Sequence, residues 1–178
     1  MIKACDKTHS LAVAVLNFEK EFNVGGVIRT ANAAAVREVI IVGRKNWNKS
    51  AATGAHTRTK IYHIPTIDEF LVHVISCGYS IVSLEIDERA EDIFSCQYSP
   101  NPIIVIGNEG KGIPEKILEK SSKIIRIPQF GQVECLNAAA SAAIAIYDWI
   151  RKNADSSSSC KIKGRKYQTT YKTANMRK

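Results

Sequence analysis

The chain has 178 residues, of which 45% are hydrophobic and 24% charged, with a formal net charge of +8. This length predicts one domain with a full hydrophobic core, and we expect neither a membrane span nor a signal peptide, because no apolar run approaches ~20 residues. The five cysteines include no Cys-x-x-Cys pair, so no metal site and no disulfide framework is indicated, and a cytoplasmic protein with reduced thiols is expected.

The chain begins with a strand, a helix and a second strand. Residues 11–16 form a continuous apolar run, typical of a strand buried on both sides. Asn23 is interpreted as the N-cap of a helix reaching about residue 36, with Gly25 and Gly26 indicating a close packing partner. Arg29 falls on the second turn of that helix, where a structural role is the usual one, and residues 38–42 form the next strand.

Residues 43–60 are long for a segment without periodicity, and long loops are commonly functional. Five basic side chains accompany the aromatic Trp47 among small polar residues: Arg44, Lys45, Lys49, Arg58 and Lys60, of which Arg44, Lys45 and Arg58 are the candidate RNA contacts. Cations with an aromatic ring suit a contact with nucleic acid, and a solvated loop is the alternative.

The next elements are a short strand, a helix and another strand. Residues 62–64 form the short strand, and Thr66 with Glu69 forms a capping box that opens a helix closing at Gly78. Residues 79–84 form the strand that follows. Beyond it, residues 87–99 are acidic and irregular, and the sequence assigns them no role.

Two further strands each run into a glycine-containing polar loop. The strands are residues 103–106 and 124–127, the loops are residues 107–112 and 128–135, and an Ala-rich helix follows over 136–150. The alternation of strands and helices predicts an α/β fold, a mostly parallel sheet with helices on both faces. In such sheets ligands bind at the carboxyl ends of strands, where glycine lets the backbone approach them, so these loops form the candidate site; ordinary strand-to-helix turns are the alternative.

The positive charge lies at the C-terminal end of the chain. Residues 151–178 hold nine of the 25 Lys and Arg residues and one of the 17 acidic residues, which leaves 16 of each in the rest. We therefore expect a core domain over residues 1–153 and a basic, flexible tail over 154–178 that contacts a polyanion through Lys163, Arg165 and Lys166. A solvated tail without a binding role is the alternative.

Three segments carry a family resemblance: residues 23–31 (NVGGVIRTA), 106–112 (IGNEGKG) and 127–137 (IPQFGQVECLN). In this order they resemble the three signature motifs of the SpoU (TrmH) branch of the SPOUT-class RNA methyltransferases. The resemblance covers roughly residues 11–150. It implies a deep trefoil knot near the C-terminal end of the sheet, a homodimer, and methyl transfer from S-adenosylmethionine to a ribose 2′-hydroxyl of tRNA or rRNA.

The resemblance also implies site residues. The catalytic positions of the family fall on Arg29, Asn23, Glu109 and Asn137. Contacts to the methyl donor fall on Gly107, Ile127, Leu136, Leu84 and Cys135, and RNA contacts are expected from Arg29 and from the basic residues of the long loop and the tail. Two positions depart from the family pattern: Cys135 stands where Ser is usual, and Gln129 stands where Met is usual. The thiol of Cys135 is a weaker hydrogen-bond donor than a hydroxyl.

The chemistry of these residue types favours particular roles. An arginine is always protonated, so we expect Arg29 to clamp a phosphate rather than to act as the base. Glu109 and Asn137 are expected to organise the loop, and Glu109 as general base is the competing assignment. A non-catalytic RNA-binding protein with the same fold is the alternative function, whereas an NTP-hydrolysing protein is disfavoured because residues 107–112 lack the P-loop arrangement.

Overall fold

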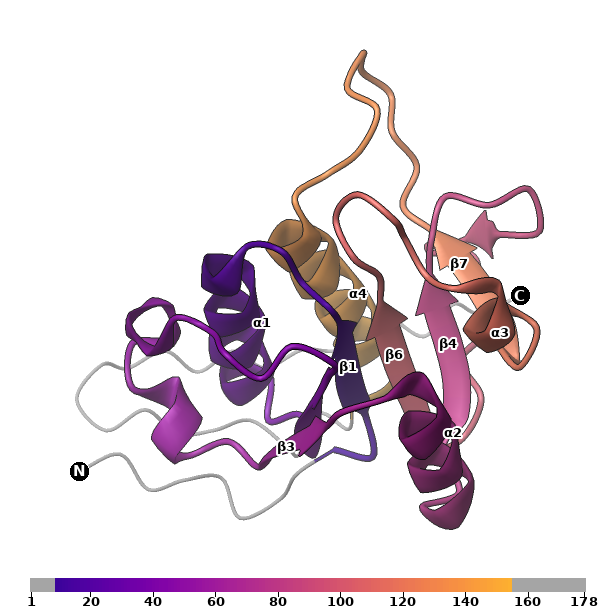
Figure 1. Ribbon diagram of the computed structural model, residues 1–178. Helices are drawn as coiled ribbons and strands as arrows, with labels where there is room; N and C mark the ends of the chain where they lie inside the picture. Colours follow the sequence, from indigo (N-terminus) through magenta and orange to yellow (C-terminus); the bar gives the residue numbers. More distant parts are fainter. Residues whose placement is uncertain (1–8, 155–178) are drawn as a thin grey trace.

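The seven strands of the sheet lie in the order β3-β2-β1-β6-β4-β7-β5, and every neighbouring pair is parallel. The computed structural model, which describes residues 9–154, is drawn in Figure 1. The strands are β1 (Ala12–Leu16), β2 (Glu38–Val42), β3 (Ile61–Ile64), β4 (Ser80–Leu84), β5 (Glu91–Asp92), β6 (Pro102–Ile106) and β7 (Lys123–Arg126). The predicted parallel α/β sheet is confirmed, and the knot stays a prediction.

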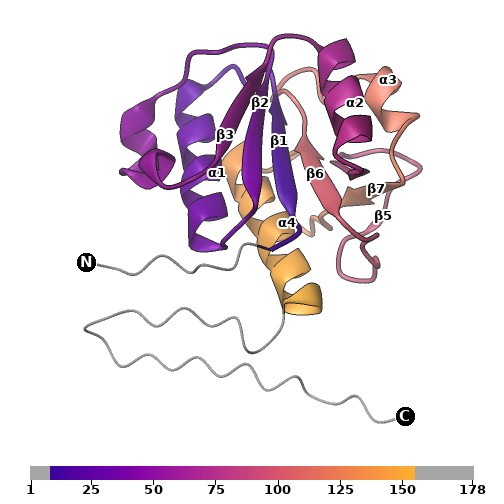
Figure 2. The same ribbon diagram turned by 90° about the horizontal axis from the view of Figure 1, so that it is seen from below.

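Helices cover both faces of the sheet, as predicted. Helices α1 (Glu21–Ala33) and α4 (Ala138–Asn153) pack side by side on one face, and α2 (Ile67–Ser76) and α3 (Glu115–Leu118) lie on the other (Figure 2). Two short 3-10 helices, η1 (Lys49–Ala52) and η2 (Ala55–Thr57), pack against α1. None of the helices in residues 9–154 has the length and apolar character that crossing a membrane requires.

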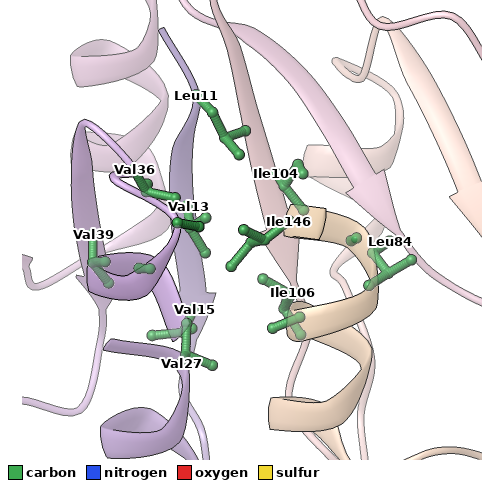
Figure 3. Packing of buried hydrophobic residues seen from close by; sticks show 14 of the residues in the cluster. Leu11, Val13, Val15, Val27, Val36, Val39, Leu84, Ile104, Ile106 and Ile146 are labelled. Carbon is green, nitrogen blue, oxygen red and sulfur yellow. The ribbon is translucent and has the colours of Figure 1, made fainter. Parts of the chain in front are cut away.

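The central strands are buried on both sides, which is why their sequences show no polar alternation. Every residue of β1, β2 and β6 is buried. Val13 and Val15 face the layer of α1 and α4, where they meet residues such as Ile146 (Figure 3), whereas Ala12 and Ala14 face α2 and α3. Each buried aliphatic side chain contributes roughly 1.5–3 kcal/mol relative to exposure.

Two glycines let other elements approach helix α1 closely. A Cβ atom on Gly25 would lie 2.5 Å from the Cβ of Ala51, and one on Gly26 would lie 3.1 Å from the Cβ of Ala139. The glycines that weaken α1 by propensity therefore serve its packing against η1 and α4, as the sequence indicates.

Several predicted boundaries are corrected. Helix α1 begins at Glu21 after Lys20 and ends at Ala33, so Asn23 is not its N-cap. The side chain that contacts the start of this helix is Glu109, from the distant loop after β6, and local sequence patterns do not reveal this contact. The acidic segment after β4 contains the two-residue strand β5, and residues 43–60 contain η1 and η2 rather than a plain loop.

Other local predictions are confirmed. The hydroxyl of Thr66 accepts a hydrogen bond from the Glu69 N–H at 3.2 Å, so α2 begins where its capping residues predict. The tail and its three predicted RNA contacts, Lys163, Arg165 and Lys166, lie outside the described residues.

Candidate functional site

A cavity of about 530 Å³ opens at the carboxyl ends of β4, β6 and β7. The start of α1 and the segment that leads from β7 into α4 complete its walls, and this segment rises beyond the edge of the sheet in Figure 1. The five residues predicted to contact a methyl donor all line this main cavity: Leu84, Gly107, Ile127, Cys135 and Leu136. The structure thus brings together residues from three strand ends, as the strand-end rule predicts.

The loop after β6 folds back on itself. The Asn108 N–H donates to the Gly112 carbonyl at 3.1 Å, and the Gly112 N–H returns a bond to the Asn108 carbonyl at 2.9 Å. A Cβ atom on Gly107 would lie only 2.4 Å from the backbone carbon of Gly112, so glycine is required where the two arms of the loop meet. The backbone of this loop is thereby fixed in place beside the cavity.

Glu85, the residue that follows β4, connects this loop to the rest of the cavity. Its Oε2 accepts a hydrogen bond from the Ile113 N–H at 2.7 Å, and its Oε1 accepts one from the Ile86 N–H at 3.0 Å. The carboxylate therefore fixes the far end of the glycine loop to the end of β4.

Three of the predicted catalytic residues form one hydrogen-bonded chain. The Asn23 amide donates from Nδ2 to Glu109 Oε1 at 2.8 Å, and Asn137 Nδ2 donates to Asn23 Oδ1 at 3.1 Å. Asn23 is only 5% exposed, so its polar groups depend on these partners. Residues separated by 114 positions along the chain are thus tied together at one corner of the main cavity.

The two ends of this hydrogen-bonded series each lie at the start of a helix. Glu109 accepts from the backbone N–H groups of Glu19 at 2.8 Å and Lys20 at 3.4 Å, just before α1. Asn137 caps α4 by accepting from the N–H groups of Ala139 at 3.0 Å and Ala140 at 3.2 Å. Each helix start is therefore positioned by a side chain of the candidate site.

Glu109 is held in its ionised form. Burial by itself would raise the pKa of this carboxyl, but the hydrogen bonds from Glu19 and Asn23 outweigh burial and lower the pKa below its ordinary value. A carboxylate whose oxygens are occupied by structural donors, near the positive end of a helix, is suited to organising the loop.

Arg29 is the one predicted catalytic residue that does not line the main cavity. It lies six residues after Asn23 on α1, which turns it about 240° around the helix axis. Arg29 lines a second depression of about 290 Å³ between α1 and the two 3-10 helices, with Asn32, Thr53 and Arg58. We call this depression the arginine hollow.

The other predicted RNA contacts of the long loop are placed near α1. Arg44 is exposed, and its Nη1 donates to the carbonyl of Glu19 at 3.3 Å; Lys45 is exposed as well. Trp47 is partly buried against the core and meets the ring of His56 edge-on at 5.7 Å. The aromatic residue of this segment therefore serves packing, and the basic residues face solvent.

Several residues of the main cavity were not singled out as site residues from the sequence. The charged side chains of Lys20, Glu85 and Arg126 all contribute to its lining. Glu85 directly follows β4 and Arg126 ends β7. Ligands bind at the carboxyl ends of parallel strands, so these positions could have been recognised from the sequence as cavity residues. Gln129 also lines the cavity, and its Nε2 donates to the Glu134 carbonyl at 3.1 Å.

Comparison with known proteins places these features in context. The SpoU rRNA Methylase family model matches residues 10–147. The tRNA (guanosine(18)-2′-O)-methyltransferase of Escherichia coli (strain K12) is 30% identical over 141 residues, which cover 78% of this chain and 62% of that protein. The chain thus spans about three fifths of the length of the curated relatives it matches.

Solved structures show the same fold. The A. aeolicus TrmH/SpoU tRNA modifying enzyme superposes with a TM-score of 0.76 at 25% identity, covering 84% of this chain and 78% of that chain. An AdoMet-bound rRNA methyltransferase from Sinorhizobium meliloti gives a TM-score of 0.75 at 24% identity, covering 82% and 57% respectively. The parallel sheet described above is therefore shared with these proteins.

Proposed function

The chain belongs to the SpoU rRNA Methylase family, and from this premise we propose that it transfers a methyl group from S-adenosylmethionine to a ribose 2′-hydroxyl of tRNA or rRNA. The observation that carries the proposal is the main cavity. It collects every residue assigned to donor contact, from three strand ends and from the segment that leads into α4, next to the hydrogen-bonded residues Asn23, Glu109 and Asn137.

The cavity fits the proposed donor in size and in character. Its volume of about 530 Å³ lies within the range of small-molecule sites, about 300–1,000 Å³. Apolar side chains such as Leu84, Ile127 and Leu136 suit a nucleoside base, and the backbone exposed beside Gly107 offers hydrogen bonds. When bound, S-adenosylmethionine supplies a methyl group on a sulfonium that is already activated for displacement.

The protein's own residues then have to align the ribose hydroxyl with the methyl group and stabilise the charge that develops on the hydroxyl oxygen. Arg29 clamps a phosphate beside the target ribose with its guanidinium, and the positive charge lowers the cost of the developing alkoxide. Because arginine stays protonated, the phosphate or a water takes the hydroxyl proton. Glu109, Asn23 and Asn137 hold the glycine loop and the starts of α1 and α4 in register, which keeps the cavity in shape for alignment.

We further propose that the enzyme acts as a homodimer in which one subunit's Arg29 serves the main cavity of the other. Two observations support this. Within one chain Arg29 lines the arginine hollow and not that cavity, and apolar side chains are exposed on α1, on α4 and on the projecting segment. Phe130 is 93% exposed and Phe22 65% exposed, and Tyr147 on α4 is also exposed. A second copy that covers these side chains would bring an Arg29 to each cavity.

The test is methyl incorporation from labelled S-adenosylmethionine into total tRNA and, separately, into rRNA, with Arg29→Ala as control. Label in one pool that disappears in the variant is the expected result, and it identifies the substrate class. If neither pool takes up label and the chain fails to bind the donor, the proposal is wrong and the non-catalytic RNA-binding alternative applies.

A further inference from the structure

The arginine hollow is separate from the main cavity, and no predicted catalytic or donor-binding residue other than Arg29 lines it. Its walls come from the second half of α1 and from the turn between η1 and η2. Arg29 and Asn32 contribute from the helix, and Thr53 and Arg58 contribute from the turn and from the end of η2.

The charge of the hollow is positive and uncompensated. Arg29 and Arg58 both line it, and within residues 9–154 no Asp or Glu side chain does. Two other arginines of the described residues pair with acids: Arg89 contacts two carboxylates and Arg151 contacts Asp148. In the same part of the chain, neither Arg29 nor Arg58 forms an ion pair, so two cationic heads remain available to an outside anion.

Within residues 9–154, most N–H groups of these two guanidinium groups also have no hydrogen-bond partner. Arg29 donates from Nη1 to the hydroxyl of Thr53 at 3.2 Å, which fixes the direction of its side chain. A guanidinium has five N–H groups in a fork that matches two oxygens of a phosphate, so most of this capacity remains.

The backbone around the hollow is held in a costly conformation. Thr53 has a φ of +48°, in the left-handed region that a β-branched residue rarely adopts. Asn32 stabilises the other side by donating from Nδ2 to the Arg58 carbonyl at 3.4 Å and to the Thr59 hydroxyl at 3.2 Å. Strained backbone held by several contacts is typical of binding sites.

We propose that the arginine hollow binds a phosphodiester group of the substrate RNA, with Arg58 as a second guanidinium beside Arg29. The inference rests on the proposed function for the identity of its ligand. Arg58 is a binding residue: it holds the RNA backbone beside the phosphate clamped by Arg29 and contributes affinity. Neither the three signature segments nor the main cavity includes it.

The experiment compares Arg58→Gln, Arg58→Lys and wild type by RNA affinity at several salt concentrations, by the kcat and KM of methyl transfer, and by donor affinity. The probe is the RNA pool that takes up label, or total tRNA if neither pool does. We expect Arg58→Gln to raise the Kd for RNA about tenfold and to reduce the slope of log K against log salt by about one. KM should rise with it, while kcat at saturating RNA and donor affinity stay near wild type.

Two controls separate a binding role from a structural one. Arg58→Lys should restore the salt slope but only part of the affinity, because lysine keeps the charge and loses the two-pronged contact. Arg37→Gln is the matched control, because it removes an exposed arginine that lines neither the hollow nor the main cavity. It should leave the RNA affinity and the salt slope unchanged.

The outcomes distinguish this inference from the proposed function. If wild type transfers methyl groups and Arg58→Gln changes neither RNA affinity nor salt slope, the inference is wrong and the proposed function stands. If wild type transfers none but Arg58→Gln still weakens RNA binding and flattens the slope, the hollow stands and the activity does not. Tight binding of inorganic phosphate that Arg58→Gln abolishes, with RNA affinity unchanged, would make the hollow a site for free phosphate and overturn the RNA assignment.

Discussion

Arg29 and Asn23 lie on the same helix, yet they contribute to different cavities. Asn23 is buried between Glu109 and Asn137, and Arg29 is exposed beside Thr53. The positions of these side chains argue for a division of roles, in which Asn23, Glu109 and Asn137 maintain the geometry of the cavity and Arg29 meets the substrate.

Replacing Arg29 by lysine tests its part in this division. We expect kcat to fall about 100-fold or more, since lysine cannot hold a phosphate with two parallel hydrogen bonds and transition-state charge loses its stabiliser. Donor affinity, measured by calorimetry, should stay unchanged because Arg29 does not line the main cavity. Near-normal turnover in this variant would show that the clamp is not needed.

The pKa of Glu109 predicts how stability depends on pH. Its folded-state pKa lies below its ordinary value of 4.5, so the ionised carboxylate stabilises the fold at neutral pH, and this contribution is lost as the pH falls through the folded-state value. In Glu109→Gln we expect a loss of about 1–2 kcal/mol at pH 7, and the difference from wild type should shrink as the pH falls below the ordinary value of 4.5 and through the folded-state pKa. Urea unfolding at neutral and at acidic pH measures it, and a difference that is constant with pH would contradict the ionised assignment.

The same variant separates the two roles considered for Glu109. If it organises the loop, the shape of the pH–rate profile should survive in Glu109→Gln even where the rate is lower. Loss of the acidic limb of that profile would instead identify Glu109 as the general base.

At the scale of elements, the site depends on three loops that meet at the carboxyl edge of the sheet. The loop after β6 is closed by the Asn108–Gly112 backbone pair and is fixed by Glu85 at the end of β4. Because Gly107 is packed directly against Gly112, the shape of this loop depends on a backbone contact rather than on a side chain.

We therefore expect Gly107→Ala to be severe. The added methyl group would meet Gly112 at 2.4 Å and push the two arms of the loop apart. Donor affinity should fall at least tenfold, and thermal unfolding should show a loss of about 1–3 kcal/mol. Gly131→Ala is the matched control, because a Cβ atom there meets nothing within 4 Å, and it should bind the donor as wild type does. Equal donor affinity in the two variants would contradict this account of the loop.

At the scale of the whole molecule, the separation of Arg29 from the main cavity predicts complementation between inactive variants. Arg29→Ala keeps a normal cavity, and Gly107→Ala keeps a normal Arg29. When equal amounts of the two variants associate at random, half of the dimers contain one subunit of each. If the active site is shared between subunits, each of these heterodimers has one complete site. The two variants are mixed, unfolded together and refolded, and this treatment should restore about a quarter of wild-type activity.

The control is each variant refolded alone, which should remain inactive. Ile127→Glu, a second change in the cavity lining, replaces Gly107→Ala if that variant fails to refold. An inactive mixture of well-folded variants that form mixed dimers would place Arg29 and the donor within one subunit.

The amino-acid sequence alone determined the class of fold and singled out eight of the residues that line the main cavity. Continuous apolar runs such as residues 11–16 indicate strands buried on both faces, and burial of all of β1 follows from that pattern. The glycine loop after β6 is visible because glycine and a strand end are local signals, and the three signature segments indicate the family, which the match over residues 10–147 establishes.

Only the tertiary structure decided which of these residues meet. No local pattern shows that Glu109 contacts the start of α1, and the predicted N-cap of that helix was three residues too late, at Asn23 instead of Lys20. The hydrogen-bonded chain from Glu109 through Asn23 to Asn137, and the turning of Arg29 into a separate hollow with Arg58, depend on contacts between distant segments and on the rotation of a helix. A sequence records which groups are present, and packing sets the distances and directions on which their chemistry depends.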